Sequence, residues 1–246
     1  MRTIFILKTG TTFNDIVKEH GDFEDWILKS IDDVEVNVID VEKCKTLPDI
    51  KECLGVIITG SHAMVTDEHD WSLKTELYIQ ELVAANVPLL GICYGHQLIA
   101  KSLGGVVGFH PKGMELGTVE IRTNEHAKND ALLHTLAKTF NVHVVHSQSV
   151  LTLPKNAVLL ASNDFEPNHI FKIEPSTWAV QFHPEYDENI MKAYIREVFK
   201  EKTGQSEQEE LLLKNVKKTT DANQIIKIFI DIAKAGISKV DDTRSM

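Results

Sequence analysis

One cysteine stands in a sequence context that could make it a nucleophile. Residues 88–100, PLLGICYGHQLIA, run from an apolar stretch through Gly-Ile-Cys-Tyr-Gly centred on Cys93. This is the thiol counterpart of the G-x-S-x-G turn, which places a nucleophile between a strand and a helix. The helix N-terminus favours a thiolate over a thiol, so the pattern predicts a nucleophile rather than a buried structural cysteine. Cys44 and Cys53 lack such surroundings and are expected to be structural.

A thiolate nucleophile needs a base that later gives its proton to the leaving group. The chain has 11 histidines, so residue type alone selects none of them. His183 is distinctive because the apolar run WAVQF leads directly into His183, Pro184 and Glu185. Glu185 can reach the second imidazole nitrogen, which sets the tautomer and stabilises the imidazolium. The pattern predicts a triad of Cys93, His183 and Glu185; the alternative is a strand-end histidine beside an exposed glutamate.

The two segments together resemble the class I glutamine amidotransferases. That family carries a cysteine turn followed by Gly-His-Gln, and a later His-Pro-Glu, as at residues 93–97 and 183–185 here. The resemblance covers roughly residues 1 to 200. Among subfamilies, the chain looks most like stand-alone relatives of the GMP synthase glutaminase and like the γ-glutamyl peptide hydrolases. The resemblance implies hydrolysis of the glutamine side-chain amide through a cysteine thioester, with ammonia released for transfer to an acceptor where one exists.

The resemblance also implies an oxyanion hole beside the triad. The turn places the backbone N–H of Tyr94 to donate to a tetrahedral oxyanion. The family completes this site with a Gly-Gly-Pro loop, whereas residues 59–62 here read Thr-Gly-Ser-His and keep one glycine. The second donor is therefore expected to be the N–H of Gly60 or Ser61.

The substrate pocket is expected to include Gln97, His146 and Gln148. Gln97 matches a pocket glutamine of the family; its alternative is a polar residue on an exposed helix face. GMP synthase glutaminases carry Ser-His-Gly-Asp where residues 145–150 read VHSQSV, so His146 matches and Gln148 replaces the aspartate. If that aspartate holds the α-amino group of glutamine, its loss leaves room for γ-glutamyl peptides. Gly104-Gly105 and Glu115-Leu116-Gly117 resemble the family's Gly-Gly and Glu-x-Gly pair, which is expected to be structural, with Glu115 facing the pocket.

The residues support three hypotheses of function. The first is a glutaminase, and the second is a γ-glutamyl peptide hydrolase that uses the same triad. The third is a non-catalytic regulatory or binding module with the same fold, against which the intact triad argues.

The pattern of apolar runs predicts an α/β fold: an open, mainly parallel sheet flanked by helices, with some antiparallel strands. Cys93 is expected at the carboxyl end of a central strand, where ligands bind in such sheets. The expected strands are residues 3–7, 34–41, 54–59, 87–92, 118–122, 140–146, 158–161, 170–173 and 179–182. The expected helices are residues 23–30, 71–85 (with Leu73, Leu77 and Leu82 near helical spacing), 96–103 and 187–200.

The family pattern is complete near residue 200, so we expect an amidotransferase domain at 1–204 and a helical extension at 205–246. The extension carries an apolar stripe, which must be buried somewhere. Either it packs on its own domain as an extra layer, or it docks on a partner such as an ammonia-consuming synthetase or a second copy of the chain. The stripe consists of Ile225, Ile226, Phe229, Ile230 and Ile232.

The composition excludes several classes of protein. A net charge of -10 disfavours a duplex nucleic-acid binder, and no apolar run approaches the ~20 residues that cross a bilayer. An odd count of three cysteines disfavours a disulfide framework, so a cytoplasmic location is expected. The sequence has no phosphate-loop motif and no zinc-like Cys/His spacing, so neither cofactor nor metal is expected. The expected ligand is glutamine or a small γ-glutamyl molecule.

Overall fold

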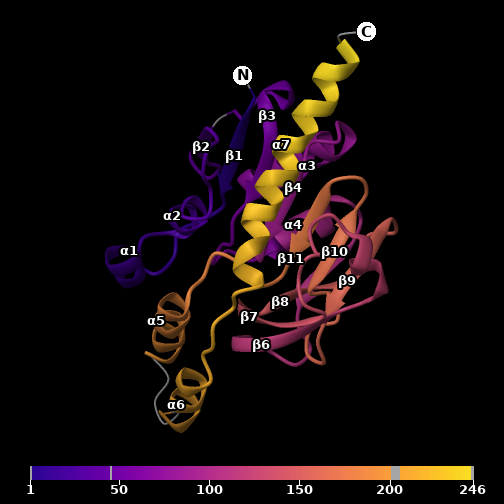
Figure 1. Ribbon diagram of the computed structural model, residues 1–246. Coiled ribbons are helices and arrows are strands. Elements are labelled where there is room, and N and C mark those ends of the chain that lie inside the picture. The colour runs from indigo at the N-terminus through magenta and orange to yellow at the C-terminus, as the bar shows by residue number, and fades with distance from the viewer. Residues whose placement is uncertain (1, 45, 201–205, 245–246) are drawn as a thin grey trace.

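The first half of the chain supplies four of the five parallel strands of a mixed β-sheet, and β11 adds the fifth (Figure 1). The computed structural model describes residues 2–44, 46–200 and 206–244. The nine strands lie in the order β2-β1-β3-β4-β11-β10-β9-β6-β7, and the first five are mutually parallel. Their bounds are β1 Thr3–Lys8, β2 Val36–Asp40, β3 Cys53–Ile58, β4 Leu89–Ile92 and β11 Thr177–Val180. The predicted fold class is confirmed.

The remaining four strands of the sheet pair antiparallel, as the sequence predicted for this end. They are β10 Ile170–Ile173, β9 Ala157–Ser162, β6 Glu115–Thr123 and β7 Thr139–His146. A separate two-stranded sheet joins β5 (Val106–Phe109) to β8 (Gln148–Thr152). Neither of these two strands was predicted, because both are short and half exposed and so lack a clear apolar period.

Side-chain alternation along the parallel strands builds one core on each face of the sheet. On β1, Ile4 and Ile6 point to one face and Phe5 and Leu7 to the other, and all four are buried. Helices α3 (Asp70–Ala84) and α4 (Tyr94–Ser102) cover the Phe5 face, and α7 (Ile225–Arg244) covers the Ile4 face (Figure 1). The sheet is therefore enclosed on both faces, as the crossover connections require.

Helix α3 forms where the sequence predicted it, but its buried face differs from the expected stripe. Leu73 and Leu77 are 40% and 62% exposed, and only Leu82 of the predicted set is fully buried. The inner face instead carries Ser72 and Thr75, because α3 packs closely on α4 and the Tyr94 hydroxyl donates to Ser72 Oγ at 2.8 Å. Small polar residues permit that close approach, which leucines would prevent.

A third, aromatic core lies beyond the carboxyl ends of the parallel strands. Helix α5 (Glu188–Phe199) packs there with α1 (Asn14–His20) and α2 (Phe23–Leu28). Helix α6 (Ser206–Lys214) contacts α5 (Figure 1). Short 3₁₀ turns lie at Ile50–Glu52, Val65–Asp67, Glu125–Asn129 and Ala222–Gln224. Within the described ranges, every helix is too short or too polar to span a lipid bilayer.

The apolar stripe of the C-terminal extension packs on its own domain. Ile225, Ile226, Phe229 and Ile230 are at most 2% exposed and join the core on the Ile4 face, with Ile232 partly buried against it. A Cβ on Gly55 of β3 would lie 3.1 Å from the Ala233 Cβ and 3.5 Å from Phe229 Cζ, so glycine permits close packing of α7. Of the two alternatives predicted for this stripe, packing on its own domain is confirmed, and docking of the stripe on a partner is wrong. The predicted boundary at 204/205 falls in residues 201–205, outside the described residues.

We predict that Phe229→Ala lowers the free energy of unfolding by about 3–5 kcal/mol, because it removes a fully buried ring from the core. Urea unfolding followed by circular dichroism measures the change. The control is Lys227→Ala on the exposed side of the same helix, expected to change stability by no more than ~0.5 kcal/mol. Equal effects of the two substitutions would show that α7 contributes no packing to the core.

Candidate active site

Cys93 occupies a strained turn between β4 and α4. The strand ends at Ile92 and the helix begins at Tyr94, two residues before the predicted start. Cys93 has φ 50° and ψ −97°, an unusual backbone conformation for a residue with a side chain. Such a conformation destabilises the folded state by on the order of 1–3 kcal/mol. Its own N–H donates to Val180 O at 2.9 Å, which fixes the turn against β11. The turn thus holds the thiol at the carboxyl end of a central strand.

The glycines of the motif are required by close backbone contacts. A Cβ on Gly91 would lie 2.5 Å from the carbonyl oxygen of Gly95, and a Cβ on Gly95 would lie 2.6 Å from that of Ile58. Both distances are shorter than any real Cβ contact, so neither position accepts a side chain.

His183 lies against the same turn and is bonded to Glu185. The structure ends β11 at Val180, so His183 lies in the loop beyond it rather than at the strand end, and its N–H donates to His143 O at 2.9 Å. Its Nδ1 lies 2.8 Å from Glu185 Oε1, and both side chains are almost fully buried. The imidazole stacks on Tyr186 with ring centroids 4.1 Å apart. The ring is therefore held in one orientation.

The charge around His183 favours the imidazolium. Burial alone would lower the pKa of His183, but the Glu185 carboxylate and negative charge on Cys93 outweigh it and raise the pKa to about 10. The second ring nitrogen, Nε2, has no hydrogen-bond partner among the described residues. This nitrogen is therefore free to exchange a proton with a bound molecule.

Gly60 lies between the cysteine and the histidine. A Cβ at this position would lie 2.9 Å from His183 Cε1 and 3.7 Å from Cys93 Cβ, so glycine leaves room for both. The neighbouring Ser61 lines the pocket, with its Oγ accepting a hydrogen bond from the Ala63 N–H at 3.0 Å. The N–H of Tyr94 belongs to the first residue of α4, where it has no acceptor in its own helix. Gly60 thus lies close to both reacting side chains, and Ser61 and Tyr94 line the same cavity as Cys93.

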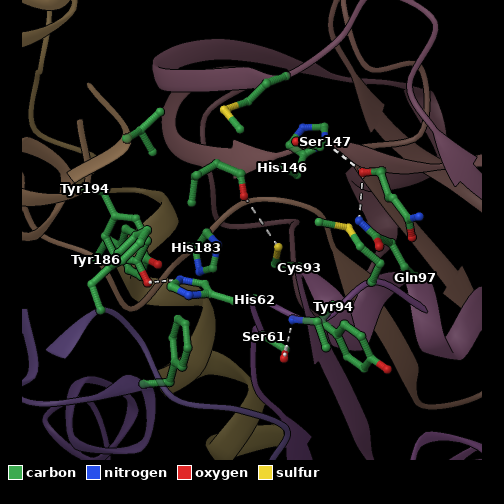
Figure 2. A pocket seen from close by; sticks show the side chains of 18 residues that line it. Ser61, His62, Cys93, Tyr94, Gln97, His146, Ser147, His183, Tyr186 and Tyr194 are labelled. Atoms are coloured by element: carbon green, nitrogen blue, oxygen red, sulfur yellow. Dashed lines mark hydrogen bonds between the residues drawn. The ribbon is translucent and has the colours of Figure 1, made fainter. Parts of the chain in front are cut away.

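These residues meet at a cavity of about 300 Å³ (Figure 2). Of the residues predicted from sequence, seven line it: Ser61, Cys93, Tyr94, Gln97, His146, Gln148 and His183. Gly60 and Glu185 lie behind the lining, against His183. Cys53 is buried away from this cavity and forms a hydrogen bond with the Tyr78 hydroxyl. Cys44 also lies outside the cavity.

Gln97 and Gln148 are fixed by hydrogen bonds and are not exposed surface groups. Gln97 is 4% exposed, and its Nε2 donates to Gln148 O at 2.8 Å and to Gln181 Oε1 at 3.0 Å. Gln148 Nε2 donates to Thr66 Oγ1 at 2.6 Å. The Oε1 of Gln148 is buried without a donor among the described residues, so it can accept a hydrogen bond from a ligand.

His146 is held from behind by Glu115. Its Nε2 lies 2.9 Å from Glu115 Oε2, and His169 Nε2 lies 3.5 Å from the same oxygen. The other carboxylate oxygen accepts from Asn163 Nδ2 at 2.8 Å. Burial raises the pKa of Glu115, but these hydrogen bonds outweigh burial and hold the pKa well below its usual range. Glu115 is thus a buried anion that does not line the cavity and fixes a residue that does.

Aromatic side chains form one wall of the cavity, and this aromatic wall was not predicted from the sequence. Phe23, His62, Tyr186 and Tyr194 line it and come from three separate segments of the chain. Tyr186 was adjacent to the His-Pro-Glu motif, and His62 directly follows the Gly-Ser pair. No motif near Tyr194 in the sequence indicated that it would line the cavity. Among the described residues, no group of three or more His, Cys, Asp or Glu side chains is arranged to hold a metal ion.

Comparisons with known proteins identify the family of the chain. Residues 16–202 match the family model described as glutamine amidotransferase class-I. The chain is 30% identical to one subunit of the glutamine-hydrolyzing GMP synthase of Archaeoglobus fulgidus, over 69% of this chain and 87% of the relative. It is 29% identical to γ-glutamyl peptidase 3 of Arabidopsis thaliana, over 82% of this chain and 80% of the relative. A solved glutamine amidotransferase of Thermotoga maritima superposes with a TM-score of 0.66 at 19% identity, over 95% of this chain and 96% of that one, and shows the shared fold.

We predict that Glu185→Gln lowers the pKa of His183 by roughly one to three pH units, because the neutral amide no longer stabilises the imidazolium. Histidine-labelled protein titrated by NMR measures the pKa without any substrate. The control is Glu188→Gln, at the start of α5, which removes a nearby carboxylate that does not contact His183. An unchanged His183 pKa in Glu185→Gln would contradict this account of the charge.

Proposed function

Because the chain belongs to the class I glutamine amidotransferases, we propose that it hydrolyses the γ-amide of a glutamyl substrate through a thioester on Cys93. The observation that carries the proposal is the meeting of three features at one cavity: a strained cysteine turn, a buried His–Glu pair, and the loop at Gly60 and Ser61. Glutamine is the simplest such substrate, and ammonia is then the leaving group.

The first half of the reaction forms the thioester. The Cys93 thiolate attacks the amide carbon, forming a C–S bond and moving the carbonyl electron pair onto oxygen. The C–N bond then breaks, and the proton on His183 Nε2 passes to the departing nitrogen. The raised pKa of His183 supports this assignment, because it favours the protonated imidazole.

Backbone donors stabilise the tetrahedral intermediate in this proposal. The N–H of Tyr94, at the positive end of α4, and the N–H groups of Gly60 and Ser61 are assigned to the developing oxyanion. Removing one such donor in a hydrolase costs on the order of 10²–10³ in kcat. The glycine at position 60 is needed so that the loop approaches both reacting side chains.

The second half of the reaction releases the acid. Neutral His183 takes a proton from water, and the resulting hydroxide attacks the thioester carbon. The C–S bond breaks, the sulfur leaves as thiolate, and the glutamyl carboxylic acid is released. Glu185 stabilises the imidazolium formed in this step and keeps Nε2 directed at the reacting atoms.

Hydrolysis of γ-glutamyl peptides is the second candidate, with the same residues. Gln148 stands at the position where GMP synthase glutaminases have an aspartate, and its free Oε1 offers a neutral acceptor in place of a charge. One relative is named a γ-glutamyl peptidase and another belongs to a glutamine-hydrolysing synthase. In the first candidate, a separate synthetase chain would accept the ammonia.

We predict that Cys93→Ala lowers kcat/KM for glutamyl amides by at least ~10³-fold, because it removes the nucleophile. Mass spectrometry of the intact protein, after reaction with a glutamine analogue carrying a diazoketone in place of the amide, should show one adduct that disappears in Cys93→Ala. The control Cys44→Ala should label and turn over as the parent does. An adduct on Cys44 or Cys53 would count against Cys93 as the nucleophile.

A competition assay decides between the two candidates. Glutamine and a γ-glutamyl dipeptide are mixed with the purified protein, and both products are followed by chromatography. If the protein is a γ-glutamyl peptide hydrolase, kcat/KM for the dipeptide exceeds kcat/KM for glutamine by about tenfold or more, because the dipeptide fills more of the cavity. A tenfold preference for glutamine would remove the peptide candidate. Hydrolysis of neither compound would favour a non-catalytic binding module.

A further inference from the structure

The two walls of the cavity differ in chemistry, and Cys93 lies between them (Figure 2). On one side lies Gln97, with His146 and Ser147 above it. Gln148 also lines the cavity, and its backbone oxygen accepts a hydrogen bond from Gln97 Nε2. This polar wall offers neutral donors and acceptors, including the unpartnered Oε1 of Gln148. A γ-glutamyl group carries an ammonium and a carboxylate of its own, so its acyl end suits this wall.

The opposite wall is mainly aromatic, and the Tyr186 hydroxyl on it has no hydrogen-bond partner among the described residues. His62 packs on Phe13 with ring centroids 4.4 Å apart and on Tyr194 at 6.1 Å. The Tyr194 hydroxyl is already bonded to Thr12 Oγ1 and lies 3.4 Å from His62 Nε2. Val198 extends this aromatic wall with a branched aliphatic side chain.

No cavity-lining side chain within the described ranges belongs to Asp, Glu, Lys or Arg. His62 does not supply a cation either, since burial and the positive charge of His183 lower the pKa of His62. The imidazolium of His183 is already paired with the Glu185 carboxylate, so a charged group placed against the aromatic wall would lose water without gaining a partner of its own, which is costly. An apolar group placed there would gain contact area.

The position of His183 decides which part of the substrate faces the aromatic wall. The group that protonates the leaving nitrogen must lie within hydrogen-bond reach of it. His183 stands between Cys93 and the aromatic wall, stacked on Tyr186, and its Nε2 is unpartnered among the described residues (Figure 2). A substituent on the leaving nitrogen therefore extends over His62 and Tyr194, and the acyl end lies along the polar wall.

Resting on the proposed function, we propose that the aromatic wall is a specificity site for the leaving amine. The preferred substrates are γ-glutamyl amides of uncharged apolar amines, and glutamine and γ-glutamyl amino acids are poorer ones. The chemistry is the thioester route given above, with the amine leaving in place of ammonia. The site consists of the aromatic wall, Phe23, His62, Tyr186 and Tyr194, extended by Phe13 and Val198.

Four substrates test the proposal with the full-length protein. They are glutamine, γ-glutamyl methylamide, γ-glutamyl phenethylamide and γ-glutamyl phenylalanine; the last two differ only by a carboxylate. We expect kcat/KM for the phenethylamide to exceed each of the others by at least tenfold, the scale on which apolar pockets discriminate. Equal values for methylamide and phenethylamide, or a value for the phenylalanine compound that matches the phenethylamide, would overturn the proposal.

A gain-of-charge variant tests the site directly. Val198→Arg places a cation at the aromatic wall, so the ratio of kcat/KM for γ-glutamyl phenylalanine to that for the phenethylamide should rise at least tenfold. The control Leu77→Arg adds the same charge on exposed α3, outside the cavity, and should leave the ratio unchanged. An unchanged ratio in Val198→Arg would overturn the assignment of this wall to the amine.

The same assays separate this proposal from the function on which it rests. Hydrolysis of all four compounds with equal kcat/KM, lost in Cys93→Ala, would overturn the specificity site and support the proposed function. Hydrolysis that persists in Cys93→Ala, or no hydrolysis of any compound by the parent protein, would overturn both.

Discussion

The close contact between β4 and α4 is the constraint on which the centre of the molecule depends. The helix turns back on the strand so tightly that a Cβ on Gly91 would lie 2.5 Å from the Gly95 carbonyl oxygen. The residue between them, Cys93, is forced to a positive φ and lifted out of the strand direction. Packing on either side of the turn offsets this strain: Leu98 and Ile99 of α4 are fully buried on the sheet, and the contact with β11 fixes the turn.

Two buried carboxylates organise the surroundings of this turn, and each has its own histidine. Glu185 holds His183 on the aromatic side of the cavity, and Glu115 holds His146 on the polar side. Neither carboxylate lines the cavity, so each acts through the imidazole that it orients. Burial makes such charges costly unless they are bonded, and the hydrogen bonds to His146, His169 and Asn163 meet this requirement for Glu115.

Helix α7 buries one face of the sheet, as α3 and α4 bury the other. The two faces of the sheet carry alternate side chains of the same strands, so leaving one face bare would expose Ile4, Ile6 and Ile57. Helix α7 covers that face from a region of the chain well beyond the site motifs, and Gly55 allows it to approach β3. The core that supports the cysteine turn is therefore shared between both ends of the chain.

The sequence by itself determined the local features, because their information is contiguous. The glycines around Cys93, the His-Pro-Glu run and the alternating apolar strands each encode geometry within a few residues, and they predicted the fold class and a cysteine–histidine–glutamate grouping that the structure brings together. Only the tertiary structure decided the exposure of Leu73 and Leu77, the burial of the α7 stripe on its own sheet, and the aromatic wall at His62 and Tyr194. These features are contacts between segments far apart in the chain. Their positions depend on how the helices pack, and no local period in the sequence records that packing.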